Sequence, residues 1–430
     1  MREFIHGDQL KGHRAVVLGA GTSGIAAARL LVRLGASVRL LERNESVAAS
    51  IPAEAGIEIV SGEHRPEHFS DADLVVLSPG IPKAKVASLL PSAAQVVSEL
   101  ELASWFVSEP VIAVTGTNGK TTTTTLIGRI LERSGRKVFT GGNIGTPLCE
   151  YLLGSERAEV LVLEVSSFQL QNSPSFHPRV AVLLNFSANH LDYHETMEEY
   201  LQAKLSMFAH MEAGDLAVAP LSMKDELEGR DFTRASRVYF VASRRFDCPG
   251  LPGEHNRENM EAAYLACRHL GLTEDEVRRG IEGFATLPHR IEAVAEHRGI
   301  LFVDDSKSTT VDSMIAALKS QDRPVRLLAG GVFKGGDLGE VLPLLRERVR
   351  GIYLFGKSRE IFEAAWAGCG REMTWDATLE EAVFRAASEA RQGECVLLSP
   401  ATASFDLFAN YKERGKTFQR AVREWVEGSA

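Results

Sequence analysis

The segment TGTNGKTT, residues 115–122, holds the residue types that bind a nucleoside triphosphate. It follows the apolar run Val111–Val114 and precedes apolar residues at helical spacing, so we expect a strand, a loop and a helix. Amides at the helix start and the Lys120 ammonium can bind phosphates, and the Thr121 hydroxyl can bind Mg²⁺. The common GxxxxGK(S/T) pattern would have glycine in place of Val114, so this is a variant loop. The segment predicts ATP binding.

Two further polar residues follow apolar runs in the same region. Glu164 lies near the end of Val160–Val165, and His190 follows Val180–Leu184. Because the carboxyl ends of parallel strands share one edge of a sheet, we expect both side chains near the nucleotide loop, where carboxylate and imidazole groups suit Mg²⁺. Either residue alone is more often an ordinary surface or core residue. Their joint placement favours a metal site.

A glycine fingerprint, GAGTSG at residues 19–24, lies between the apolar run Ala15–Leu18 and a helical pattern over residues 25–34. Glu42 follows the next apolar run. Glycines in this position let the backbone approach a pyrophosphate at a helix N-terminus. The residues alone leave three interpretations open: NAD binding, binding of another nucleotide diphosphate such as a nucleotide sugar, and a purely structural turn.

Three polar segments in the last third of the chain also follow apolar runs. They are residues 304–310 (DDSKSTT), 330–334 (GGVFK) and 399–405 (SPATASF). Three polar strand ends on one sheet suggest a ligand-binding edge. Two other places are ambiguous. Lys204 lies in a helical stretch whose local pattern favours an exposed lysine, and the segment GEHNREN, residues 253–259, suits a helix-capping segment and an adenine contact equally well.

Length and composition limit the class of protein. The 430 residues, at roughly 150 per domain, indicate about three domains. Strands that alternate with helices predict an α/β fold with a mainly parallel sheet in each of the domains 1–99, 100–287 and 288–430. A net charge of −9 disfavours general nucleic-acid binding. Five cysteines without a CxxC pair fit free thiols, and no apolar run reaches the ~18 residues of a membrane span. We therefore expect a cytoplasmic protein without membrane insertion.

Taken together and in this order, GTNGKTT, LEVSSFQL, GEHNREN, LPHR, DDSKSTT and SPATASFD resemble the Mur ligase family, and the resemblance runs from Gly19 to Tyr411. It implies a Rossmann-like UDP-binding domain, a P-loop ATPase-like central domain and a Rossmann-like C-terminal domain. It also implies an ATP-dependent amide ligase of peptidoglycan precursor synthesis, which forms an acyl phosphate and releases ADP and phosphate. By the same resemblance we expect a monomer that closes about hinges near residues 99 and 287.

Within the family, the third domain suggests the amino acid. DDSKSTT is similar to the Asp-Ser-Lys-Ala-Thr-Asn run of D-glutamate-adding members, whereas L-alanine-adding members would carry an Asp-Tyr-x-His-His-Pro-like run. Ser308 and Thr310 depart from the first run, and the expected phosphate contacts Lys307 and Thr309 are kept. The expected substrates are UDP-N-acetylmuramoyl-L-alanine and D-glutamate. L-alanine addition is the alternative, and an NAD-dependent oxidoreductase is a remote one.

The resemblance also implies roles for single residues. Contacts with the UDP substrate are expected from Gly21, Thr22, Gly24, Glu42, Ser78, Gly80, Asn143, Ser166 and Gln169. Contacts with ATP are expected from Gly116, Thr117, Asn118, Gly119, Lys120, Thr121, Thr122, Asn259, Arg290, Asp305 and Lys307. Contacts with D-glutamate are expected from Thr309, Lys334, Ser404, Phe405 and Tyr411. Ligands to two Mg²⁺ ions are expected to be Thr121, Glu164, His190 and Lys204, of which Lys204 matches the family's carbamylated lysine. The expected catalytic residues are Lys120, His190 and Lys204.

Overall fold

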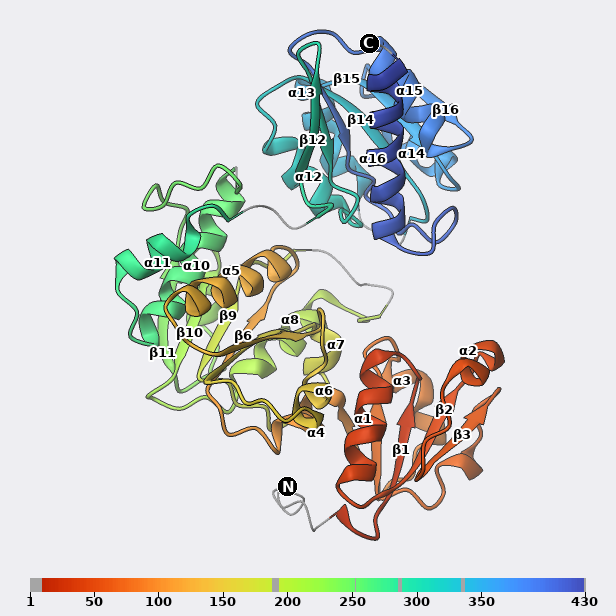
Figure 1. Ribbon diagram of the computed structural model, residues 1–430, viewed down its shortest axis with the longest axis vertical. Coiled ribbons are helices and arrows are strands. Elements are labelled where there is room, and N and C mark those ends of the chain that lie inside the picture. The colour runs from red at the N-terminus through yellow and green to blue at the C-terminus, as the bar shows by residue number, and fades with distance from the viewer. Residues whose placement is uncertain (1–9, 188–192, 252, 285–287, 334–336, 429–430) are drawn as a thin grey trace. The chain divides into compact units, whose positions relative to one another are not determined.

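The computed structural model describes residues 10–187, 193–251, 253–284, 288–333 and 337–428 of the chain. These residues form three β-sheets flanked by helices (Figure 1). One compact unit contains the first two sheets, and a second compact unit contains the third. The predicted fold class, α/β with mainly parallel sheets, is confirmed. The domain boundaries at residues 99 and 287 stay predictions.

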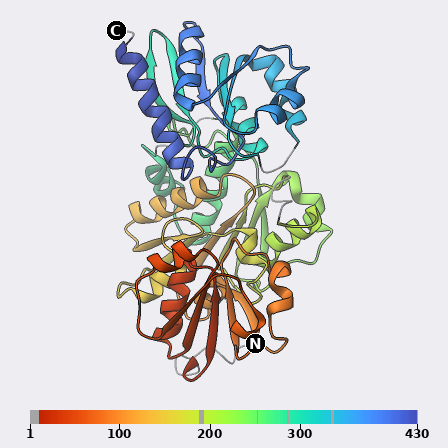
Figure 2. The ribbon, with the colours of Figure 1, turned by 90° about the vertical axis from the view of Figure 1, so that its right-hand side faces the viewer.

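The first sheet has the strand order β3-β2-β1-β4-β5, and all of its neighbouring strands are parallel. Figure 2 shows these strands side by side in red and orange. The strands are β1 (Arg14–Leu18), β2 (Ser37–Glu42), β3 (Ile57–Ser61), β4 (Leu74–Leu77) and β5 (Gln95–Ser98). The helices are α1 (Thr22–Arg33), α2 (Glu45–Ser50), α3 (Lys83–Val86) and α4 (Glu99–Ser104). The strand order reverses beside β1, so the carboxyl end of β1 is where such a sheet binds ligands.

The second sheet has the order β11-β10-β9-β6-β8-β7 and is also entirely parallel. Its strands are β6 (Val111–Thr115), β7 (Val138–Gly142), β8 (Val160–Glu164), β9 (Val180–Leu183), β10 (Leu216–Pro220) and β11 (Ser236–Phe240). Its helices are α5 (Lys120–Arg133), α6 (Leu148–Leu153), α7 (Ser167–Leu170), α8 (Met197–Leu205), α9 (Lys224–Glu228), α10 (Glu254–His269) and α11 (Glu274–Ile281). The central strand β6 lies between β8 and β9, which places its carboxyl end at the reversal point of this sheet.

The first two sheets share a core within their unit. Helix α1 packs against α4 and α6, and Arg33 Nη1 donates to Leu153 O at 2.7 Å. Buried side chains from both sheets, including Val17 and Leu163, belong to one continuous apolar cluster. Because apolar burial is the main favourable term in folding, this shared cluster couples the stability of the two sheets.

The third sheet has the order β12-β13-β17-β14-β15-β16, with β12 antiparallel to β13 and the other pairs parallel. Its strands are β12 (Glu292–His297), β13 (Ile300–Asp304), β14 (Val325–Gly330), β15 (Val349–Phe355), β16 (Met373–Asp376) and β17 (Cys395–Leu398). Its helices are α12 (Val311–Lys319), α13 (Leu342–Arg348), α14 (Arg359–Trp366), α15 (Leu379–Glu389) and α16 (Tyr411–Gly428). The strands β12 and β13 are joined by Arg298 and Gly299, whose φ angles of +50° and +74° suit a tight hairpin turn.

Alternating side chains give the third sheet two apolar faces. Phe302 and Leu328 pack with α15 and α16, which lie side by side in Figure 1. Their neighbours Val303 and Leu327 point the other way and pack with α12, α13 and α14. All five cysteines of the chain are buried free thiols, as predicted. Among the described residues, no helix has both the length and the apolar character required to cross a membrane.

Candidate active site

The nucleotide loop joins β6 to α5 and places Lys120 at the first residue of the helix. Gly119 has φ +81°, and a Cβ there would lie 2.6 Å from Asn259 Oδ1, so glycine is needed for the loop to pass that amide. Lys120 Nζ donates to Gly116 O and Thr117 O, both at 2.8 Å. The strand, loop and helix predicted from this segment are confirmed. The segment GEHNREN lies at the start of α10, and its last residue, Asn259, lies inside that helix against the loop.

Asn185, just after β9, holds the loop from the side. Asn118 N donates to Asn185 Oδ1 at 2.8 Å, and Asn185 Nδ2 donates to Asn118 O at 3.2 Å. Thr117 N also donates to the Asn185 carbonyl at 3.2 Å. Sequence reasoning did not select this residue, although its place directly after an apolar strand run is the signal that identified Glu164.

Glu164 ends β8 and is only 3% exposed. Thr121 Oγ1 donates to Glu164 Oε2 at 2.6 Å, and Asn143 Nδ2 donates to Glu164 Oε1 at 2.9 Å. A hydroxyl and a carboxylate that meet beside a phosphate loop are the hard oxygen ligands that Mg²⁺ prefers. The structure therefore brings together three predicted site residues from different elements: Thr121 at the start of α5, Asn143 after β7 and Glu164 at the end of β8. The predicted ligand His190 lies outside the described residues.

Lys204 lies in α8 and is buried, with 1% of its surface exposed. The prediction of an exposed lysine, made from its local helical pattern, is wrong because α8 packs this face against the nucleotide loop. Its Nζ donates to Gly116 O at 3.0 Å and lies 4.4 Å from the centre of the Tyr200 ring. Burial, and then the nearby charge of Lys120, hold the pKa of Lys204 well below its usual value. Its surroundings therefore favour the neutral form of the amine.

At the carboxyl end of β1, the glycine fingerprint forms a turn that needs small residues. A Cβ on Gly24 would lie 1.9 Å from Gly19 O, so α1 starts too close to the loop for any side chain there. Ser78 Oγ donates to Gly19 O at 2.9 Å, which ties the end of β4 to this turn. Glu42 accepts from Ala20 N and Asn44 N, both at 2.9 Å.

The remaining residues expected at the UDP substrate divide into two groups. Gly21 is the N-cap of α1, Thr22 is its first residue, and Gly80 follows β4, so these three lie with the fingerprint. Ser166 and Gln169 instead form the capping box of α7, in which Ser166 Oγ donates to Gln169 Oε1 at 3.0 Å. Gln169 is buried, so the structure gives its side chain a capping role.

In the third sheet, loops after β13, β14 and β17 carry the predicted residues. Lys307 Nζ donates to Tyr411 OH at 3.3 Å and lies 4.4 Å from the centre of the same ring, which brings a predicted ATP contact beside a predicted D-glutamate contact. Ser404 is buried, whereas Phe405 is 67% exposed. Lys334 lies outside the described residues. Thr310, one of the two departures from the expected run, caps α12 by accepting from Ser313 N at 3.3 Å.

Sequence reasoning missed Arg414, a fully buried side chain in α16. Its guanidinium donates to Ser306 O at 2.8 Å, to Thr402 O at 3.0 Å and to Gly330 O at 3.4 Å. Burial lowers the pKa of Arg414 to about 10, which leaves it charged at pH 7. One side chain thus connects the three loops that carry the predicted ligand edge, and no local pattern marks it.

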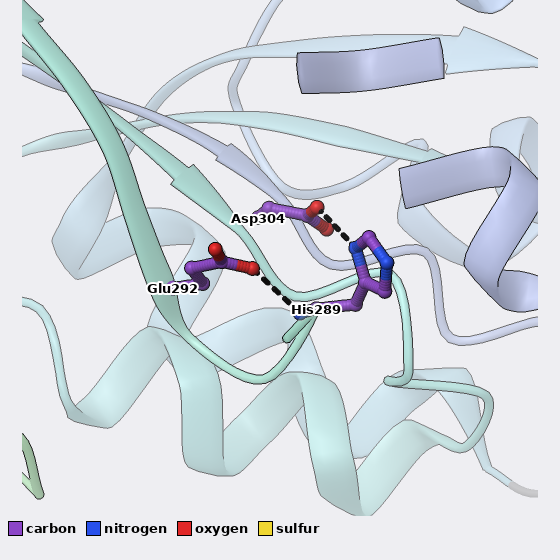
Figure 3. Close-up of side chains that lie close together, drawn as sticks. All are labelled: His289, Glu292 and Asp304. Atoms are coloured by element: carbon purple, nitrogen blue, oxygen red, sulfur yellow. Dashed lines mark hydrogen bonds and ion pairs between the residues drawn. The ribbon is translucent and has the colours of Figure 1, made fainter. Parts of the chain in front are cut away.

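The turn that carries Arg290 is fixed by three close side chains, which Figure 3 shows. His289 Nδ1 bonds Asp304 Oδ2 at 2.7 Å, and Glu292 Oε2 accepts from His289 N at 2.8 Å. Gln419 Nε2 donates to both carboxylates, at 3.1 Å to Glu292 and 3.0 Å to Asp304. His289 has φ +66°, an uncommon angle that these bonds impose. The potential metal-ligand atoms of this group are all engaged in hydrogen bonds within the protein, so we infer that the group fixes the conformation of the Arg290 turn.

Comparison with known proteins agrees with this arrangement over the whole chain. Three family models match in sequence: the Mur ligase MurD-like N-terminal domain at residues 13–98, the Mur ligase middle domain at residues 114–245, and the Mur ligase glutamate ligase domain at residues 289–402. The chain is 55% identical over 421 residues to the UDP-N-acetylmuramoylalanine–D-glutamate ligase of Nitratidesulfovibrio vulgaris strain DP4, with 96% of both chains covered. It is 52% identical over 427 residues to the ligase of the same name from Oleidesulfovibrio alaskensis, covering 96% of this chain and 94% of the relative.

Solved structures share the fold at low identity. The MurF ligase from Thermotoga maritima in complex with ADP matches with a TM-score of 0.61 and 19% identity, covering 99% of this chain and 98% of that one. The UDP-N-acetylmuramate-alanine ligase MurC from the same organism matches with a TM-score of 0.57 and 18% identity, covering 97% and 100%. These matches concern the three-domain α/β fold alone. Together with the consecutive family models and an identity above one half to named ligases, they show that this chain belongs to the Mur ligase family.

Proposed function

We propose that this protein adds D-glutamate to UDP-N-acetylmuramoyl-L-alanine in peptidoglycan precursor synthesis, with conversion of ATP to ADP and phosphate. The observation that carries the proposal is the 55% identity to a ligase of that name over 96% of both chains. Beside the nucleotide loop, the Glu164 carboxylate accepts hydrogen bonds from Thr121 and Asn143, and this arrangement supports ATP-dependent chemistry. The relatives' names give no support to L-alanine addition or to an NAD-dependent oxidoreductase.

Joining a carboxylate to an amine is unfavourable in water, so the carboxylate must first be activated. An oxygen of the L-alanyl carboxylate attacks the γ-phosphorus of ATP, the bond to the β-phosphate oxygen breaks, and ADP leaves. The amine of D-glutamate then attacks the acyl carbon of the acyl phosphate. The resulting tetrahedral intermediate loses a proton from nitrogen and expels phosphate, which leaves the amide. No covalent enzyme nucleophile is required, so the protein acts by position and charge.

Lys120 and the loop amides bind the phosphates in this scheme. In the structure Lys120 Nζ is held by two carbonyls of its own loop, and phosphate oxygens are stronger acceptors that would replace them. As charge moves onto the bridging and γ oxygens, a fixed ammonium stabilises the transition state more than the ground state. Asn185 keeps the loop in the shape that presents Lys120.

Thr121 and Glu164 fit a bound Mg²⁺, because they supply a hydroxyl and a buried carboxylate 2.6 Å apart. When bound there, Mg²⁺ would neutralise charge on the phosphate oxygens. Asn143 donates to the second oxygen of Glu164 and so orients the carboxylate. His190 remains the predicted third ligand.

For the second predicted metal site we propose that Lys204 is carbamylated. A neutral amine attacks CO₂ and loses one proton, which converts the side chain into a carboxylate-like group with two oxygen ligands. Three observations support this reaction: Lys204 is buried, it has no ion-pair partner among the described residues, and it lies beside the nucleotide loop. A buried lysine with a lowered pKa supplies the neutral amine that the reaction needs.

The two other substrates are assigned to different sheets. The turn at the carboxyl end of β1, with Ser78 and Glu42, would bind the UDP moiety through amides at the start of α1. In the unit with the third sheet, Thr309, Ser404, Phe405 and Tyr411 would contact D-glutamate, and Lys334 would pair with one of its carboxylates.

A substrate panel tests the proposal. Purified protein would be given ATP, Mg²⁺ and UDP-N-acetylmuramoyl-L-alanine with D-glutamate, L-glutamate, L-alanine or meso-diaminopimelate in parallel, and both phosphate release and product mass would be measured. Product with D-glutamate alone supports the assignment. Product with another amino acid keeps the ligase chemistry and overturns the specificity. Binding of both nucleotides without any product would contradict the ligase assignment itself.

A further inference from the structure

Residues 143–147, which connect β7 to α6, are fixed at their first end to the predicted metal ligand Glu164; we call them the Asn143 loop. Asn143 N donates to Glu164 O at 2.8 Å, and Asn143 Nδ2 donates to Glu164 Oε1 at 2.9 Å. Gly142 N donates to Thr146 O at 2.9 Å, which closes the loop on itself. A Cβ on Gly142 would lie 2.5 Å from Glu164 O, so the backbone here is in close contact with the end of β8. The orientation of the Glu164 carboxylate therefore depends on where the Asn143 loop lies.

The other end of the Asn143 loop is fixed by Glu99, which comes from a different element. The loop leads into α6, whose N-cap residue Pro147 provides no side-chain hydrogen bond. The first amides of a helix have no partner within the helix, so they need acceptors from elsewhere. Glu99 Oε1 accepts from Cys149 N at 2.6 Å, and Glu99 O accepts from Cys149 Sγ at 3.6 Å. Glu99 thus takes the place of the missing cap of α6.

Glu99 itself has a rigid support. It is the first residue of α4, which packs against α6 (Figure 1), and it is buried. Ser98 N donates to Asn172 O at 2.8 Å, and Ser98 Oγ lies 2.7 Å from Ser173 Oγ. By contrast, residues 144–146 in the middle of the Asn143 loop are half-buried or exposed. The two anchored ends, rather than packing of the middle, therefore define where the loop lies.

We propose that Glu99 is a positioning residue for the Mg²⁺ site: by capping α6 it holds the loop from which Asn143 orients the Glu164 carboxylate. The inference rests on the proposed function, under which Thr121 and Glu164 bind Mg²⁺. Glu99 itself would touch neither the metal nor a substrate, because it acts through the backbone of the Asn143 loop. A carboxylate that hydrogen bonds hold in one orientation binds its metal more tightly, since it loses less freedom on binding.

Binding of Mn²⁺ in the presence of ADP tests the inference without catalysis. Mn²⁺ suits the same oxygen ligands as Mg²⁺, and its EPR signal distinguishes free from bound ion. Glu99→Met keeps the approximate size of the side chain and removes the acceptor. It should raise the Kd for Mn²⁺ by about three- to tenfold, which is less than the roughly 10- to 100-fold typical for loss of a direct partner of a metal ligand. Glu99→Gln keeps an acceptor for Cys149 N and should bind Mn²⁺ like wild type.

Glu101→Met is the matched control, because Glu101 is also a buried carboxylate of α4 but holds a different segment. Its side chain accepts from Trp105 Nε1 at 3.0 Å and from Ser175 N at 3.1 Å. Glu101→Met should therefore lose stability in urea denaturation, as Glu99→Met does, but keep the wild-type Kd for Mn²⁺. An equal rise of this Kd in both methionine variants would show a general loss of structure and would overturn the inference.

Glu99→Asp replaces Glu99→Met in all of these measurements if circular dichroism shows that the methionine variant does not fold. It keeps a carboxyl group but shortens the side chain by one methylene, which withdraws the acceptor from Cys149 N. The same direction of change in the Kd for Mn²⁺ is expected.

A double variant identifies the route from Glu99 to the metal. Asn143→Ala removes the side chain that orients Glu164, so adding Glu99→Met should not raise the Kd for Mn²⁺ further. A wild-type Kd in the folded Glu99 variant, or effects that multiply in the double variant, would each overturn the inference. Wild-type protein that does not bind Mn²⁺ in the presence of ADP would instead contradict the metal site of the proposed function.

Discussion

At the scale of a single residue, the substitution Lys204→Ala tests whether the Lys204 side chain carries a carbamate. Lys204→Ala should lose activity by about 100-fold or more, because it removes a charged group beside the phosphates. Added acetate or propionate should restore part of the activity, since a small carboxylate can enter the space of the missing side chain and supply two oxygen ligands. Initial rates at increasing acid concentration, at constant ionic strength, measure the effect.

Lys120→Ala is the matched control, because Lys120 and Lys204 both donate to Gly116 O. It should be inactive as well, but a carboxylate cannot replace a lost ammonium, so the same acids should give no recovery. Equal recovery in both variants would mean a general salt effect. No recovery in Lys204→Ala would contradict the carbamate proposal.

At the scale of elements, the junction between β5 and α4 contains an unusual carboxylate. Glu99, the first residue of α4, is 1% exposed; its Oε1 accepts from Cys149 N at 2.6 Å, and its Oε2 is buried without a partner. Burial raises the pKa of Glu99 to about 7 from an ordinary value of 4.5. Between these two pH values the folded protein keeps a proton that the unfolded chain has released. Stability should therefore fall as pH rises through this window.

Glu99→Gln removes that dependence, because an amide does not ionise and can still accept from Cys149 N. The free energy of unfolding of wild type should fall, relative to the variant, by up to about 3 kcal/mol between pH 5 and pH 8. Urea denaturation at several pH values measures both proteins. Curves that stay parallel over the whole range would show that Glu99 does not carry the proton.

Elements with a continuous apolar run could be predicted from the sequence almost to the residue. The runs Val111–Val114 and Val180–Leu184 match the strands β6 and β9 to within one residue, since strands buried on both faces need no alternating pattern. The helical pattern over residues 25–34 is less exact: α1 runs from Thr22 to Arg33, because its first turn consists of Thr22, Ser23 and Gly24, which an apolar pattern does not include. Helix ends depend on contacts that the pattern does not contain.

The candidate site shows the same limit. The nucleotide loop was predictable because its groups are consecutive in sequence, and Glu164 because it ends an apolar strand. The role of Arg414 was not predictable, because it donates hydrogen bonds to residues up to 108 positions away in the sequence. The burial of Lys204 was not predictable either, because it depends on a loop 88 positions away. Ser308 could be recognised as a departure from the expected run, but only the fold places it against Ser399.

At the scale of the whole molecule, separate cores predict two unfolding transitions. The first two sheets share one apolar cluster, and the third sheet is covered by two clusters of its own. UDP-N-acetylmuramoyl-L-alanine should shift only the transition of the unit with the first two sheets, by about 2.7 kcal/mol at 100 times its Kd, because every residue expected to bind it lies there.

Trp105 belongs to that unit, whereas Trp366, Trp375 and Trp425 belong to the other. Fluorescence-detected urea denaturation of wild type and Trp105→Phe should then assign the transitions, since the variant loses signal only in the ligand-sensitive one. Midpoints that do not change with protein concentration would agree with the expected monomer. A shift of both transitions by this ligand would contradict the assignment of its site to the first unit.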